Sequence, residues 1–182
     1  DVSNNTALTY LYSHSNQLTS LDISQNTDLY FLKCENNQLT SLDVSNNTAL
    51  QHLHCYSNQL TSLDVSNDTA LIALHCQDNQ LTSLDLRNGN NTNMPTFSIF
   101  FNATNNPNLY CINVDDVSWS TTNWTVVNGN INTQHYFSNN CTSTEIEEYN
   151  ANKGILKIID FLGRETKQAN QPLFFIFFFS FL

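Results

Sequence analysis

Cysteine, histidine and aspartate recur in this sequence every 21 residues. These residue types can bind metals, transfer protons or act as nucleophiles. The recurring cysteines are Cys34, Cys55 and Cys76. The recurring aspartates are Asp22, Asp43, Asp64 and Asp85. Two histidines, His54 and His75, are separated by the same interval, with His52 beside them. Metal binding and acid–base chemistry are therefore the first hypotheses.

These columns fit structural roles better than catalytic ones. Zinc needs four converging N or S ligands, which a single column of cysteines does not supply, whereas small buried thiols fill a tight core well. Calcium needs six to eight oxygens, and one carboxylate in each unit provides few of them. The histidines allow only a weak metal or pH-sensing site. We predict no metal and no cofactor.

The sequence lacks the motifs of common enzyme active sites. It has no Gly-x-Ser-x-Gly elbow, no Gly-rich phosphate loop and no cysteine in an electropositive setting. With 6 basic and 16 acidic residues, the net charge is −10, which argues against binding nucleic acid. We predict that the chain is not an enzyme.

The same period covers nearly every apolar position of residues 1–88. A unit reads L-x-x-L-x-C-x-x-N-Q-L-T-S-L-D-V-S-N-N-T-A. One set of equivalent leucines is Leu8, Leu29, Leu50 and Leu71, and another is Leu18, Leu39, Leu60 and Leu81. A unit of this size cannot bury its own apolar residues, so the units must stack on one another.

This repeat resembles the leucine-rich repeats of the bacterial, internalin-like type. The resemblance implies a solenoid that is α/β by family but here consists mostly of short parallel strands and turns with little helix. It also implies a curved right-handed coil with a C-terminal cap. The apolar half-pattern occurs twice in each unit, so we expect short strand pairing on both sides of the coil.

One asparagine of each unit has a predicted structural role. These residues are Asn16, Asn37, Asn58 and Asn79. Each follows the first strand and turns the chain, and its amide can satisfy buried backbone groups of the adjacent coil.

The chain divides into four predicted parts. Residues 1–88 hold four repeats, with further repeats missing before Asp1, and residues 89–114 form an irregular final repeat. Residues 115–144 are predicted to cap the open end of the solenoid, and a disulfide between Cys111 and Cys141 would pin that cap. Residues 145–182 form a separate segment.

That last segment resembles the C-terminal sorting tail of type IX secretion. The resemblance rests on the stretch from Leu156 to Glu165 and on Asn170-Gln171-Pro172-Leu173-Phe174, and it implies export through the secretion machinery. The chain then ends in a run of phenylalanines instead of the charged strand of such tails, which suggests truncation or a frameshift. No stretch is long enough for a transmembrane helix.

The composition indicates a secreted or cell-surface bacterial protein. Only 12 % of residues are charged, while 29 are Asn, so the soluble surface must consist of Asn, Ser, Thr and Gln.

Function is expected where the repeats differ from one another while their scaffold stays constant. The variable positions face outward on the first strand of each unit and are rich in aromatic residues and histidine, which suit binding. They are Tyr10, Tyr12, His14, Phe31, Lys33, Glu35, His52, His54, Tyr56, His75 and Gln77. We predict recognition of a protein or glycan on a host or microbial surface.

Two alternatives stay open. The solenoid could be a structural spacer or a surface-layer or adhesion scaffold without a specific ligand, its aromatic residues being merely tolerated on strands. The constant Thr-Ser-Asp side could instead bind calcium or an ordered lattice such as ice or mineral.

Overall fold

The computed structural model describes residues 1–141, which form one compact unit from Asp1 to Cys141. The segment resembling a sorting tail, residues 145–182, lies outside the described residues, as do residues 142–144 of the predicted cap.

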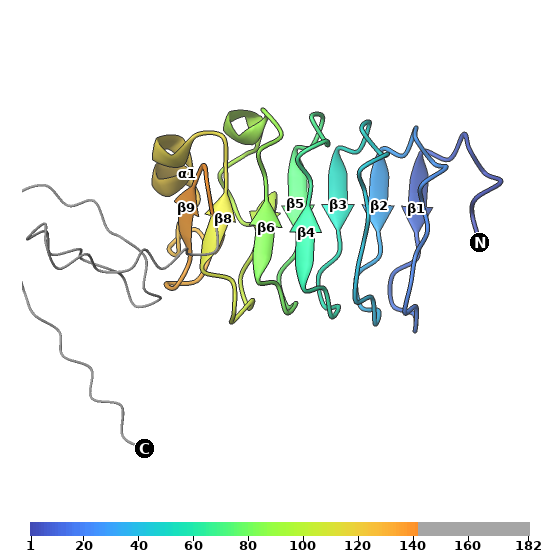
Figure 1. The fold of residues 1–182 in the computed structure, drawn as a ribbon, viewed down its shortest axis with the longest axis horizontal. Helices are drawn as coiled ribbons and strands as arrows, with labels where there is room; N and C mark the ends of the chain where they lie inside the picture. Colours follow the sequence, from blue (N-terminus) through green and yellow to red (C-terminus); the bar gives the residue numbers. More distant parts are fainter. Residues whose placement is uncertain (142–182) are drawn as a thin grey trace, which may run out of the picture. The chain divides into compact units, whose positions relative to one another are not determined.

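The described chain is a β-solenoid of parallel strands (Figure 1). Sheet A has the order β1-β2-β3-β5-β7 and sheet B the order β4-β6-β8-β9. The strands of sheet A are Tyr10–Tyr12, Phe31–Lys33, His52–His54, Ala73–His75 and Phe101–Asn102. Those of sheet B are Ser62–Asp64, Ser83–Asp85, Cys111–Asn113 and Tyr136–Ser138.

The register follows the sequence period through the regular units. Leu11 pairs with Leu32, Leu32 with Leu53, and Leu53 with Leu74. Since equivalent residues align, leucines and cysteines at the same position stack into a continuous buried core. The strand pairing expected on the second side is present from β4 onward, while the equivalent segments of the first two units are not strands.

Each unit turns at the same place by the same backbone conformation. We call the recurring asparagines Asn16, Asn37, Asn58 and Asn79 the ladder asparagines. The residue before each of them adopts a positive φ, as in Asn36 at 56° and Asp78 at 57°. Asn and Asp tolerate this left-handed region better than most residues, although Ser15 and Ser57 adopt it too.

The period lengthens after β6. Asp64 pairs with Asp85 in the regular spacing, whereas Asp85 pairs with Asn113 in β8, across a longer interval. The insertion contains the short helix η1, Asn91–Asn93. The helix α1, Val117–Asn123, and strand β9 then cover the end of the core, where the buried Trp124 packs against Phe101 and Phe137. Within residues 1–141, no helix is long and apolar enough to cross a membrane.

Candidate functional site

The predicted residues on the strands of sheet A and in the turns that follow them define a surface that we call the ring face. It consists of the eleven predicted residues: Tyr10, Tyr12, His14, Phe31, Lys33, Glu35, His52, His54, Tyr56, His75 and Gln77. Tyr10 and Tyr12 are 53 % and 58 % exposed, respectively. Because parallel pairing aligns Tyr10 with Phe31 and His54 with His75, the rings of successive units stand next to one another.

The rings contact one another from unit to unit. Phe31 stacks on His52 with centroids 4.9 Å apart, and His54 stacks on His75 at 4.4 Å. Tyr10 lies 6.3 Å from Phe31 at an interplanar angle of 18°. Such stacking turns ring faces toward one another, so edges and polar ring atoms are left for a ligand.

Phe31 is the centre of this cluster. Besides Tyr10 and His52, it contacts Tyr12 at 5.8 Å and His54 at 5.2 Å. The ammonium of Lys33 lies 5.7 Å from the ring centroids of both Tyr12 and Phe31. These contacts hold a cation against the rings, an arrangement that stabilises both partners.

Tyr30 joins the cluster although the sequence analysis did not select it. Its ring lies 5.7 Å from Tyr10 and 5.8 Å from His52. It directly precedes β2, outside the alternating positions considered, so only its aromatic character beside a variable strand could have indicated it.

The three histidines on β3 and β5 favour the neutral form. Burial lowers the pKa of His54 to about 4, with further lowering from His75, Lys33 and His52. Burial also lowers the pKa of His52, and it lowers that of His75 despite the bond from its Nε2 to the Ile99 carbonyl at 2.8 Å. The three imidazoles at the centre of the ring face are therefore uncharged at neutral pH.

Two of the predicted residues are less exposed than the alternation of a strand predicts. Glu35 is only 5 % exposed and its Oε2 has no hydrogen-bond partner among the described residues. Gln77 is half-buried, with Oε1 equally unpaired within residues 1–141. Both lie just after their strands, in the turn.

The loop before β7 adds apolar residues at the end of the ring face. Phe97 and Ile99 are 65 % and 68 % exposed, respectively. The bond between His75 and the Ile99 carbonyl places this loop over the outer side of β5. Since the loop belongs to the irregular insertion, the repeat pattern gave no signal for it.

The ladder asparagines connect consecutive coils. The Nδ2 of Asn58 donates to the carbonyls of Cys34 in the preceding coil and of Cys55 and Tyr56 in its own, while its Oδ1 accepts from the Leu39 N–H. Asn37 and Asn79 make the equivalent bonds. Asn16, in the first coil, donates only within its own turn, and Asn106 continues the ladder beyond the regular repeats.

The cysteine column lies inside the coil. Cys34, Cys55 and Cys76 are fully buried, and each Sγ is 3.5 Å from a backbone carbonyl of the next coil. Burial raises the pKa of Cys34 and Cys76 to about 12. These thiols therefore stay protonated, so they are poor nucleophiles and poor metal ligands. Across residues 1–141, no group of three or more His, Cys, Asp or Glu could hold a metal ion.

The aspartate column lies on the side of the coil that carries sheet B, and each carboxylate binds its own turn. The Oδ1 atoms of Asp22, Asp43 and Asp64 accept from the N–H groups of Ser24, Ser45 and Ser66, respectively. Hydrogen bonds with these serines lower the pKa of Asp22 and Asp43. The donors offset the repulsion between like charges on neighbouring coils.

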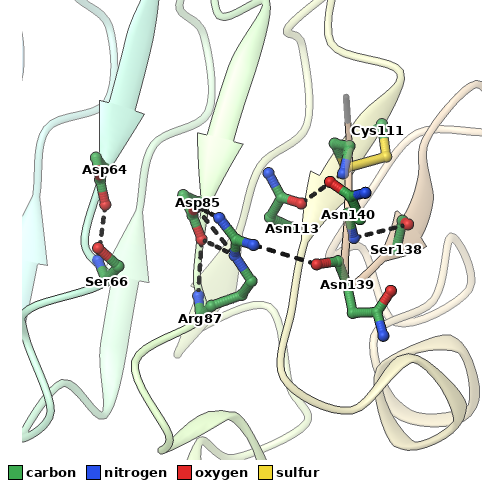
Figure 2. Close-up of polar contacts among 10 residues, drawn as sticks. Asp64, Ser66, Asp85, Arg87, Cys111, Asn113, Ser138, Asn139 and Asn140 are labelled. Carbon is green, nitrogen blue, oxygen red and sulfur yellow. Dashed lines mark hydrogen bonds and ion pairs between the residues drawn. A yellow bond between two sulfur atoms is a disulfide. The ribbon is translucent and has the colours of Figure 1, made fainter. Parts of the chain in front are cut away.

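The last aspartate of the column is linked to the cap (Figure 2). Arg87 replaces the serine, forms an ion pair with Asp85 and donates from Nη1 to the Asn139 carbonyl at 3.2 Å. The predicted disulfide between Cys111 and Cys141 is confirmed, and the Cys141 N–H donates to Asn113 Oδ1. The end of the cap is thus bound to the solenoid by covalent and polar contacts.

A comparison with solved structures identifies the architecture. The chain is similar to the functional domain of InlJ from Listeria monocytogenes, a domain that includes a cysteine ladder, with 36 % identity and a TM-score of 0.52. The match covers 62 % of this chain and 26 % of that one. The fold is an internalin-like leucine-rich repeat solenoid. The expected fold class is therefore confirmed, and the stacked Cys34, Cys55 and Cys76 are a further shared feature.

This chain spans only about a quarter of the InlJ structure that it matches. A scan against protein-family models and a search of curated proteins gave no match.

Proposed function

We propose that this chain is a non-enzymatic recognition module that binds a protein or glycan of a host or microbial surface through the ring face. The observation that carries the proposal is the run of rings across four neighbouring strands of sheet A, from Tyr10 to His75. Large rings with polar ends, held by their neighbours, give contact area at a low cost in conformational entropy.

The ring geometry favours a protein over a glycan. Sugars pack against open aromatic faces, whereas Phe31, His52, His54 and His75 turn their faces toward one another. The exposed edges, the imidazole nitrogens and the Tyr12 hydroxyl match the mixed polar and apolar surface of a protein partner. The similarity to a functional domain of InlJ agrees with a protein-binding repeat module.

The proposal places the protein outside the cell. The disulfide between Cys111 and Cys141 and the Asn-rich surface suit a secreted or surface-displayed bacterial protein. The tail resembling a type IX sorting signal would supply the contact with the secretion machinery.

The test is a binding screen of the oxidised full chain against arrays of glycans and of host and microbial surface proteins. The variant Tyr12→Ala/His54→Ala/His75→Ala is run in parallel, and Ser20→Ala/Ser41→Ala/Ser62→Ala on the side of sheet B serves as its matched control. We expect a protein hit that the first variant loses and the second retains. A hit retained by both variants would place the site elsewhere.

The second candidate function is a structural spacer. It is favoured by the uniform coil-to-coil hydrogen bonds of Asn37, Asn58 and Asn79, which set a fixed shape. If the screen gave no hit for a chain that unfolds cooperatively, the spacer function would replace recognition.

A further inference from the structure

A second asparagine column, on the turn that follows the side of sheet B, is interrupted by an acid. The column contains Asn26 and Asn47, and the equivalent residue of the next unit is Asp68. All three side chains are fully buried. Asp68 is therefore a carboxyl group in a position that holds an amide in the two preceding units.

The asparagines show what this position requires. The Nδ2 of Asn26 donates to the carbonyls of Val2 and Asn5, and that of Asn47 donates to those of Ile23 and Asn26. Their Oδ1 atoms have no partner among the described residues. Each site thus offers two carbonyl acceptors from the preceding coil and no donor.

In the repeat, the carbonyls equivalent to those that Asn47 binds belong, for Asp68, to Val44 and Asn47. Both carboxyl oxygens of Asp68 lack a hydrogen-bond partner within residues 1–141. An ionised carboxylate can only accept hydrogen bonds, so among carbonyl oxygens it would be buried, charged and unpaired, which is strongly unfavourable. A neutral carboxylic acid can donate its O–H to one of the two carbonyls.

We propose that Asp68 is a proton-binding site: in the folded protein it is a neutral acid that hydrogen-bonds the preceding coil, and its ionisation weakens the junction between the second and third repeats. Ionisation releases the carboxyl proton to solvent and leaves the two carbonyls facing a negative charge. The same junction carries the contacts of Phe31 with His52 and His54 on sheet A. Proton binding at Asp68 does not depend on which ligand the ring face binds.

The surrounding charges act in the same direction. Burial raises the pKa of Asp68 to about 8, with further raising by Asp64 on β4 and by Asp43 in the preceding coil. Both neighbours are carboxylates, and no cation among the described residues contributes to this shift. The folded state therefore keeps the proton through neutral pH, where an unfolded aspartate with a pKa near 3.8 has lost it.

The sign of the pH dependence follows from this difference. Between about pH 4 and pH 8 the folded chain binds one proton more at Asp68 than the unfolded chain, so the unfolding equilibrium constant rises by about tenfold for each pH unit from this group. The contribution to stability is fully present below pH 4 and is lost as the pH rises through 8.

The experiment compares urea unfolding of the full chain and of Asp68→Asn from pH 5 to pH 9. Asn restores the donor, so the variant should gain stability relative to the native chain as the pH rises. Asp28→Asn, an exposed acid changed in the same way, should follow the native chain. Asn47→Asp should create the same alkaline sensitivity one junction earlier.

Carbon-13 NMR of the Asp68 carboxyl in the native chain gives a readout that does not depend on a variant folding. A carboxyl that titrates near pH 8 supports the proposal. A carboxyl that titrates near pH 4, or parallel pH profiles for the native chain and Asp68→Asn, would overturn it. If calcium or sodium restored stability at pH 9 only in the native chain, a carboxylate–cation site would replace the neutral acid.

Discussion

The two sides of the solenoid use the same backbone in different ways. On sheet A the outward side chains touch the next coil, as Phe31 touches His52 and His54 touches His75. On the side of sheet B the outward aspartates bind their own turns, as Asp43 accepts from the Ser45 N–H. Contacts between coils therefore couple the residues of the ring face. Each aspartate of the column makes its hydrogen bond within its own coil.

The interior asparagines support both sides, and removing one should have the largest effect. Asn58→Ala deletes bonds to Cys34, Cys55 and Tyr56 and leaves the Leu39 N–H without its acceptor. We expect a loss of about 3 kcal/mol in the free energy of unfolding, because buried backbone groups lose their partners. Urea denaturation measures it.

The control for this change is Asn46→Ala, at an exposed asparagine whose single side-chain bond is 3.5 Å long. It should change stability by less than about 0.5 kcal/mol. Equal effects of the two substitutions would show that the buried column does not hold the coils together.

Coupling on the ring face is tested at Phe31. Phe31→Ala removes contacts with four rings, and each aromatic pair contributes about 0.5–1.5 kcal/mol beyond its buried area. We expect a loss of about 2 kcal/mol in unfolding free energy, the lower end of that range for four partly exposed ring pairs, together with NMR shift changes at His52 and His54. Ser41→Ala on the other side should leave stability within about 0.5 kcal/mol of the native value.

A double-mutant cycle separates coupling from simple loss of area. The pair of Phe31→Ala and His52→Ala should be non-additive by at least about 0.5 kcal/mol. The pair of Asp43→Asn and Asp64→Asn, on the side of sheet B, should be closer to additive. Additive behaviour of both pairs would remove the proposed contrast between the two sides.

The ring face should also lose stability in acid. Because burial and His75 depress the pKa of His54 to about 4, the unfolded chain takes up this proton at a higher pH than the folded chain. Stability from this group is fully present above about pH 6.5 and is lost as the pH falls toward 4. His54→Gln should reduce that acid loss, as measured by thermal unfolding at pH 7, 5.5 and 4.5.

NMR titration of the imidazole resonances provides the direct check. A His54 resonance that titrated near 6.5, the ordinary value for histidine, would contradict the environment described here.

The repeated parts of this molecule were predictable because equivalent residues have equivalent neighbours. The leucine register and the outward side of Tyr12 and His54 follow from spacing. The pairing of Cys111 with Cys141 could be predicted because the other three cysteines share one inward repeat position. The loop that places Ile99 against His75 lies in an insertion without a repeat. The burial of Glu35 differs from the exposure of His14 at the same repeat position, which a repeating pattern cannot distinguish.

Calcium should have the smallest effect, although sheet B carries the column of acids. Asp22, Asp43 and Asp64 each use Oδ1 for a backbone N–H of their own turn, which leaves one carboxylate oxygen per coil, far from the six to eight oxygens that calcium prefers. A hollow of about 200 Å³ beside Asp43 and Asp64 adds the side-chain oxygens of Ser41, Ser45, Ser62 and Asn67, but these are neutral and three of them are hydroxyls, whereas calcium sites use mainly carboxylates and carbonyls. We expect melting temperatures in millimolar calcium and in chelator to agree within about 1 °C, since a ligand stabilises only in proportion to its binding. If calcium raised the melting temperature and Asp64→Asn abolished that rise, the side of sheet B would be a second binding surface. The two sides would then differ in the type of ligand that they bind.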